Sequence, residues 1–144
     1  MNDYEKYEIE CDRIRAENEK LLEEFSLWLK KSGLTERTVS RHNENVAFYI
    51  NEFLLYSDIE EAKDGAYSIN MYLGYWFIKK AMWSSEASIK SNATSLKKFY
   101  TFMNEKGLVD NETLQDLKDT IKEEMAGWLR AMRKYDDLTI DDVW

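Results

Sequence analysis

The sequence predicts an all-α protein, and three observations support this prediction. The chain has 144 residues with no proline and only 5 glycines, and proline and glycine are the residues that most often interrupt helices. Apolar residues recur at spacings of three and four, which is typical of amphipathic helices. Hydroxyl residues precede some of these stretches, where they can cap a helix. A chain of this length folds as one domain and can bury about 68 to 70% of its unfolded surface.

The first helix is predicted from about Tyr4 to Lys31, with Gly33 ending it in a left-handed conformation. Its apolar stripe follows heptad spacing, with Asn18 in the one polar position, and comprises Tyr7, Cys11, Ile14, Leu21, Phe25 and Trp28. The stripe favours packing within the monomer. The alternative is a dimer interface in which Asn18 sets the register.

The second helix is predicted to begin at Leu34 and Thr35 and to extend to about residue 55. Its core stripe is predicted to be Val39, Val46, Tyr49, Ile50 and Phe53, and its exposed stripe Arg37, Arg41, Glu44 and Phe48. An acidic connection at 58–65 ends in the turn signal Asp-Gly. A third helix at 66–83 is apolar nearly all round and is therefore predicted in the middle of a bundle. Gly74 inside it either allows a close helix crossing or is an uncompensated cost of about 1 kcal/mol relative to alanine.

The fourth helix is predicted to start near Ser85 or Ser88 and to end at Gly107. Its inward residues are predicted to be Ile89, Ala93, Leu96, Tyr100 and Met103, and its outer flank Lys90, Thr94, Lys97 and Thr101, with Ser91 and Lys98 beside them. A fifth helix is predicted from about Glu112 to Tyr135, and its outer side is largely acidic at first and basic late. Its apolar face comprises Leu114, Leu117, Ile121, Met125, Trp128 and Met132.

The net charge of −8 is distributed unevenly along the chain. Residues 1–29 carry 9 acidic and 4 basic side chains, residues 107–144 carry 10 and 5, and residues 30–106 carry 9 and 11. Because the Debye length is about 8 Å at physiological salt, acidic ends held away from a basic face would be largely screened from it. The central region can therefore bind an anionic partner despite the total charge.

Several classes of protein are excluded by the composition. The single cysteine, Cys11, cannot form a disulfide within the chain, and one histidine is too few for a zinc site of Cys and His ligands. The acidic start differs from a secretory signal, and the longest apolar run, Met71 to Ile78, is too short to span a bilayer. We therefore expect a cytoplasmic protein with no membrane contact, no metal and no cofactor.

Two segments carry a resemblance to a known family. The second helix matches the pattern L-[ST]-x-x-T-[VI] and the apolar positions after it, at Leu34, Thr35, Thr38, Val39, Val46, Phe53 and Leu54. The fourth helix matches a pattern of hydroxyl residue, isoleucine, leucine, basic pair, aromatics and glycine, at Ser88, Ile89, Leu96, Lys97, Lys98, Phe99, Tyr100, Phe102, Gly107, Leu108 and Val109. These segments resemble the core-binding (SAM-like) domain that precedes the catalytic domain in tyrosine recombinases of the phage integrase family.

The resemblance covers roughly residues 17–109, with His42 where the family often has tyrosine. Residues 138–143, LTIDDV, also resemble the start of the family's catalytic domain, L-[ST]-x-[DE]-[DE]-[VI]. The resemblance implies an orthogonal bundle of four helices of the SAM-like, integrase N-terminal type, plus an additional C-terminal helix. This single core-binding-like domain would span residues 1–135, and residues 136–144 would be a tail that begins a missing catalytic domain.

The resemblance further implies a module that grips duplex DNA with the basic faces of helices two and four. Basic and hydroxyl side chains contact phosphates without reading base sequence, so we expect weak, salt-sensitive and poorly specific binding. The expected contact residues are Arg37, Thr38, Arg41, Lys90, Thr94, Lys97 and Lys98.

Catalysis by this chain is not expected, because the family's His-x-x-Arg motif is absent and the only histidine lies in His42-Asn43-Glu44-Asn45. We expect His42 to be a packed core residue. The alternative function is a helical protein–protein interaction or dimerisation module with no nucleic-acid role. It would bind another protein, or a second copy of the chain, through the first or fifth helix, or through Val143 and Trp144 at the chain end.

Overall fold

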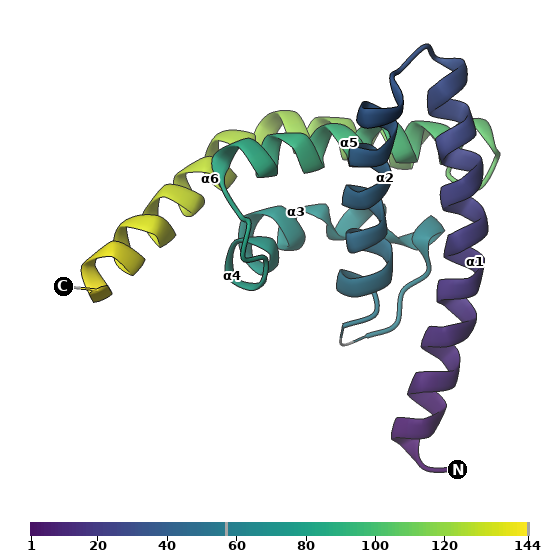
Figure 1. Ribbon diagram of the computed structural model, residues 1–144, viewed down its shortest axis with the longest axis horizontal. Helices are drawn as coiled ribbons and strands as arrows, with labels where there is room; N and C mark the ends of the chain where they lie inside the picture. Colours follow the sequence, from purple (N-terminus) through teal and green to yellow (C-terminus); the bar gives the residue numbers. More distant parts are fainter. Residues whose placement is uncertain (57, 144) are drawn as a thin grey trace.

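A computed structural model describes residues 1–56 and 58–143, and for 139–143 it describes only the course of the backbone. The described part is an all-α helical bundle without strands, as predicted (Figure 1). The first long helix, α1, spans Asp3–Lys31, and α2 spans Glu36–Phe48 and continues into a π-helical turn, η1, at Tyr49–Phe53. Helices α5 and α6 span Glu86–Glu105 and Asn111–Val143.

The ends of these helices follow the predicted local signals. Gly33 (φ 89°) ends the α1 region and Gly107 (φ 83°) follows α5, and both adopt the left-handed conformation. Thr35 caps α2 by accepting a hydrogen bond from the Thr38 amide. Ser85 and Ser88 form a reciprocal capping box at the start of α5, so both candidate serines take part.

The buried face of α1 differs from the predicted stripe in its C-terminal half. Leu22 and Leu29 are buried there, whereas Leu21 and Trp28 are half-buried. A straight α-helix drifts by about 20° per heptad from an exact seven-residue repeat, so the face in contact moves to the neighbouring residues. Asn18 is buried within the monomer, where its Nδ2 donates to Ile50 O (3.3 Å) and Asn51 Oδ1 (2.9 Å).

The third segment was predicted to be one regular helix at 66–83, and this prediction is wrong in both the regularity and the bounds of the helix. The segment begins as a 3₁₀ helix, η2, at Ala62–Ser68 and continues through α3 (Ile69–Met71), a π-helical turn η3 (Tyr72–Trp76) and α4 (Phe77–Lys80). Two buried tyrosines from other helices hold its start, because Tyr49 Oη donates to Gly65 O (2.5 Å) and Tyr100 Oη donates to Ala62 O (2.8 Å). Tertiary hydrogen bonds therefore shape this segment.

The predicted central position of this segment is only partly correct. Tyr72, Leu73 and Phe77 are fully buried, but Met71 and Tyr75 are more than half exposed. Gly74 does allow a close helix crossing, since a Cβ there would lie 2.9 Å from Cδ1 of Trp128 on α6. One side of the segment therefore packs into the core and the other faces solvent.

Helices α5 and α6 lie side by side, and α2 crosses α5 (Figure 1). All five predicted inward residues of α5 are buried. On the predicted face of α6, Leu114, Leu117, Trp128 and Met132 are buried and the other two residues are half-buried. Helix α6 continues beyond Tyr135, its predicted end, to Val143. In the described part of the chain, none of the helices has a stretch apolar and long enough to cross a bilayer.

Candidate nucleic-acid interface

A polar cluster joins α2 to α5 at their crossing. His42 Nδ1 lies 2.7 Å from Ser95 Oγ, and Asn45 Nδ2 donates to Ser91 Oγ (3.1 Å) and to Ser95 Oγ (3.0 Å). Ser95 is fully buried, and its hydroxyl donates to Ser91 O at 3.0 Å. These bonds set the position of α2 along α5, and with it the position of the side chains on their outer faces.

The hydrogen bonds of Ser95 constrain the tautomer of His42. When the Ser95 hydroxyl donates to Ser91 O, His42 Nδ1 carries a proton and donates to Ser95 Oγ. A base that activates a serine nucleophile must instead accept its proton. His42 and Ser95 are both buried, so the pair acts as a packing contact between helices, which agrees with the predicted core role of His42.

Charged side chains from both α2 and α5 contribute to the electrostatic environment of His42. Burial lowers the pKa of His42, and the positive charges of Arg41 on α2 and Lys98 on α5 lower it further. Both cations must lie near the same imidazole to act on it. One predicted contact residue from each helix therefore lies within electrostatic range of His42.

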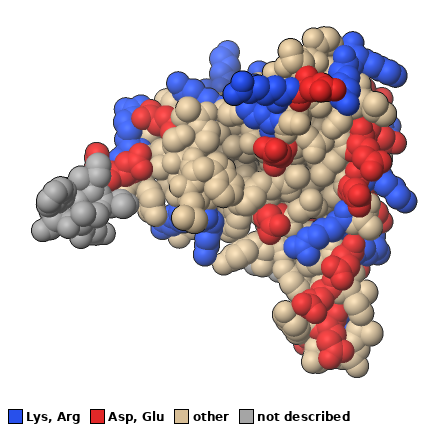
Figure 2. Space-filling view, viewed as in Figure 1, with Lys and Arg blue, Asp and Glu red and all other residues tan. Residues whose placement is uncertain are grey.

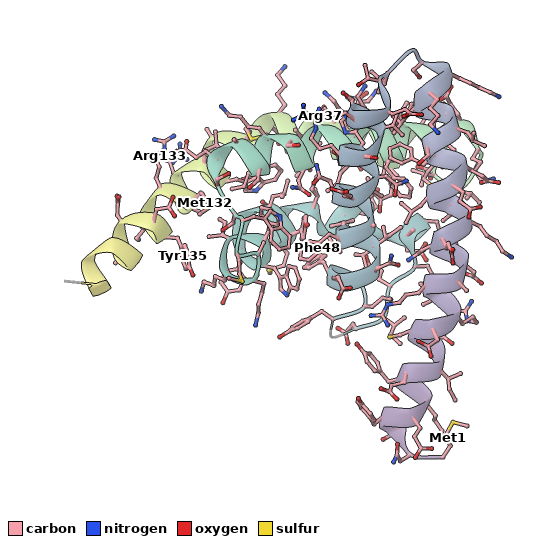
Figure 3. The ribbon with its side chains drawn as sticks, in the orientation of Figure 1. Met1, Arg37, Phe48, Met132, Arg133 and Tyr135 are labelled. Carbon is pink, nitrogen blue, oxygen red and sulfur yellow. The ribbon has the colours of Figure 1, made fainter. Side chains whose placement is uncertain are left out.

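The remaining predicted contact residues follow from helix periodicity. Arg37 lies one turn before Arg41 on α2, at the upper end of that helix where it passes α5 (Figure 3). Lys90, Thr94 and Lys97 are exposed on one flank of α5, and Thr94 Oγ1 donates to Lys90 O at 3.1 Å. These side chains are free to meet a ligand.

Thr38 is less available than predicted. Its side chain is half-buried, and its Oγ1 accepts a hydrogen bond from Thr35 Oγ1 at 3.1 Å. The residue therefore takes part in the N-terminal cap of α2.

A groove of about 690 Å³ continues the basic surface from α5 onto α6. Lys97, Lys98 and Thr101 line it from α5, and Trp28 contributes its side chain from α1. The α6 wall comprises Gln115, Lys118, Asp119, Ile121 and Lys122.

Lys118 and Lys122 were missed by the sequence analysis because they lie in a segment rich in acidic residues. Their spacing of four residues was the only local signal that they share a face of the helix. Their proximity to Lys97 and Lys98 depends on how α5 and α6 pack.

We call this surface the basic edge and define it by Arg37, Arg41, Lys90, Lys97, Lys98, Lys118 and Lys122. Figure 2 shows lysine and arginine side chains gathered along the upper border of the molecule, over α5, α6 and the beginning of α2. The N-terminal part of α1, which carries many acidic residues, projects away from this border. The acidic start of the chain is thus held away from the basic edge.

The cations of the basic edge lack a carboxylate partner among the described residues, which distinguishes them from ion-paired cations such as Lys63 and Lys106. Within the described residues, none of the seven forms an ion pair. By contrast, Lys63 pairs with Asp64 (3.1 Å) and Lys106 with Glu24 (2.7 Å). The charges of the basic edge are therefore available to an anionic ligand.

Comparisons of the chain with protein-family models, with curated proteins and with solved structures give no match. In the described part of the chain, no cluster of three or more His, Cys, Asp or Glu side chains is arranged to hold a metal ion. The side chains of the LTIDDV segment after Leu138, and those of Val143 and Trp144, lie outside the described residues.

Proposed function

We propose that this chain is the duplex-DNA-binding module of a protein similar to tyrosine recombinases and phage integrases, with a SAM-like arrangement of its helices. The observation that carries the proposal is the basic edge, where cations without an ion pair to any described residue lie on α2 and α5, which pack against each other, and on α6, which shares a groove with α5. The proposed role of this chain is binding, without catalysis.

The chemistry of the basic edge fits the phosphate backbone. Arginine and lysine donate hydrogen bonds to phosphate oxygens, and such contacts position a protein on DNA without specifying sequence. The Thr94 hydroxyl already donates to a backbone carbonyl and therefore adds only an acceptor, so the cations provide most of the binding. We expect poorly specific binding that weakens rapidly as salt is added.

The salt dependence can be estimated from the number of cations. If the five basic residues on α2 and α5 contact about four phosphates, log K should fall with log salt with a slope of about −3.6. If Lys118 and Lys122 also reach the backbone, they should steepen the slope by up to about 1.8. The slope therefore reports whether the α6 wall of the groove takes part.

The test is a titration of a short fluorescent DNA duplex, followed by anisotropy at several salt concentrations. The variants Arg41→Gln/Lys98→Gln and Lys118→Gln/Lys122→Gln each remove two cations from the basic edge. Each should weaken binding and make the slope shallower by about 1.8.

The matched control is Lys63→Gln/Lys106→Gln, which changes the net charge equally but removes two ion-paired lysines. It should leave binding nearly unchanged. Absence of binding at low salt, or an equal loss in the control, would overturn the proposal.

A protein-interaction module is the second candidate, and exposed apolar side chains favour it. Tyr56, Met71 and Tyr75 are each more than half exposed and line a groove of about 440 Å³. Sedimentation at increasing protein concentration tests self-association through this surface. Association that Met71→Ser/Tyr75→Ser abolishes would support this function, and a wild-type chain that stays monomeric would exclude self-association.

A further inference from the structure

A pocket separate from the two grooves described above lies at the C-terminal end of α2, where α2, α4 and the start of α5 meet. Its volume is about 350 Å³, and Glu44, Asn45, Phe48, Phe77, Trp83 and Asn92 line it. Volumes of this order are at the lower end of the range for small-ligand sites. None of the lining residues belongs to the basic edge.

The walls of the pocket are aromatic and held in place. The Trp83 ring meets that of Phe48 edge to face, with centroids 5.0 Å apart, and Phe48 points from α2 toward α4 (Figure 3). The Trp83 carbonyl accepts a hydrogen bond from Ser88 Oγ (3.2 Å), which ties this loop to α5. Trp83 nevertheless remains 55% exposed, so its ring is accessible to a ligand.

Two residues that line the pocket, Asn92 and Glu44, carry hydrogen-bond acceptors that have no donor partner in the described part of the chain. Asn92 is 2% exposed, and its Nδ2 donates to Ser88 O at 2.9 Å, which identifies the other amide atom as the oxygen. That oxygen, Oδ1, is buried and has no hydrogen-bond partner among the described residues. The exposed carboxylate of Glu44 also forms no ion pair with any described residue.

A buried acceptor without a donor is costly, and a ligand that donates to it would offset that cost. The carboxylate favours a positive charge, and the face of tryptophan attracts a cation within about 6 Å of the ring centre. Neither lysine nor arginine lines the pocket to compete for these groups.

We infer that this pocket binds a primary alkylammonium group, such as a lysine side chain or a free aliphatic amine. The ammonium would lie against Trp83 and beside Glu44, and a shift of the Asn92 side chain would expose its buried Oδ1 to the N–H groups of the ligand. A quaternary ammonium would bind less well, because it cannot donate a hydrogen bond. The inference does not depend on DNA binding, since the pocket and the basic edge share no residue.

The probes are butane-1,4-diamine and an acetylated, amidated Gly-Lys-Gly peptide. Two-dimensional ¹H–¹⁵N NMR spectra would follow the Trp83 indole, assigned with Trp83→Phe, and the Asn92 side-chain amide. At least one probe should shift both signals in a saturable way, and the stronger binder identifies whether a free amine or a lysine side chain is preferred. The same probes with acetylated amines should bind at least about tenfold more weakly, because the charge-assisted hydrogen bond is lost.

Glu44→Gln should also weaken binding by about tenfold or more, and since Glu44 is exposed this variant should fold normally. Glu52→Gln is the matched control, because Glu52 is an exposed, unpaired carboxylate outside the pocket. Equal affinity for neutral and charged probes, equal binding by wild type and Glu44→Gln, or no saturable shift with either probe would overturn the inference.

Discussion

Replacing Gly74 by alanine should destabilise the fold, although alanine is normally the better helix residue. A Cβ at this position would lie 2.9 Å from Trp128 Cδ1 and 3.1 Å from Nε1, closer than atoms in ordinary contact. Trp128 is 2% exposed, and its Nε1 donates to Asn70 Oδ1 at 2.8 Å. The indole therefore cannot move aside without weakening this hydrogen bond.

The magnitude follows from three opposing contributions. Overpacking of a tight contact costs about 1–3 kcal/mol. Weakening the hydrogen bond adds about 1 kcal/mol, and the helix preference for alanine recovers up to about 1 kcal/mol. The expected net loss in the free energy of unfolding is about 1–3 kcal/mol, or roughly 2–12 °C in Tm for a chain of this size.

Urea unfolding followed by circular dichroism would measure this loss, with Gly127→Ala as the matched control. Around Gly127 the nearest atom to an added Cβ is Arg130 Nη2 at 3.7 Å, so this substitution should stabilise α6 by about 0.4–1 kcal/mol. The penalty at Gly74 should shrink when Trp128→Leu is combined with it. If Gly74→Ala instead raised the midpoint as Gly127→Ala does, the close crossing would be refuted.

Three further predictions test the polar contacts of the fold. The pKa of His42 is lowered in the folded state, so the unfolded chain binds a proton more readily. The free energy of unfolding should therefore fall as pH drops below about 6.5. Urea midpoints compared across pH should show that His42→Gln lacks the part of this pH dependence that is due to His42. Ser85→Ala removes the capping box of α5 and should cost about 0.5–2 kcal/mol in the same assay, whereas an unchanged midpoint would show that the cap contributes nothing. Asn18→Ala leaves the Ile50 carbonyl without this donor and should cost about 1–3 kcal/mol; a gain in stability would contradict the role of Asn18 as a buried hydrogen-bond donor.

Features that depend on neighbouring residues were predictable from the sequence. Thr35 and Ser85 cap helices through amides three residues away, and Gly33 and Gly107 take conformations that favour glycine. The inward face of α5 follows from its spacing alone. These features depend on interactions within one or two turns, so local sequence determines them.

The tertiary structure decided which helix faces adjoin. Phe48 was predicted on the exposed stripe of α2, but it is half-buried because the rings of Trp76, Phe77 and Trp83 surround it. The 3₁₀ helix at Ala62–Ser68 depends on hydroxyl groups from distant tyrosines. In both cases the deciding partner lies far along the chain, where helical periodicity carries no information.

The same distinction applies to the candidate site. The sequence by itself determined that α2 and α5 each carry basic side chains on an outer face, because helical spacing separates them from the apolar residues. Only the tertiary structure brought Arg41 and Lys98 within electrostatic range of one imidazole and placed Lys118 and Lys122 in the groove that Lys97 and Lys98 line. The physical reason is that packing of side chains between helices, rather than any local preference, sets how one helix lies against another.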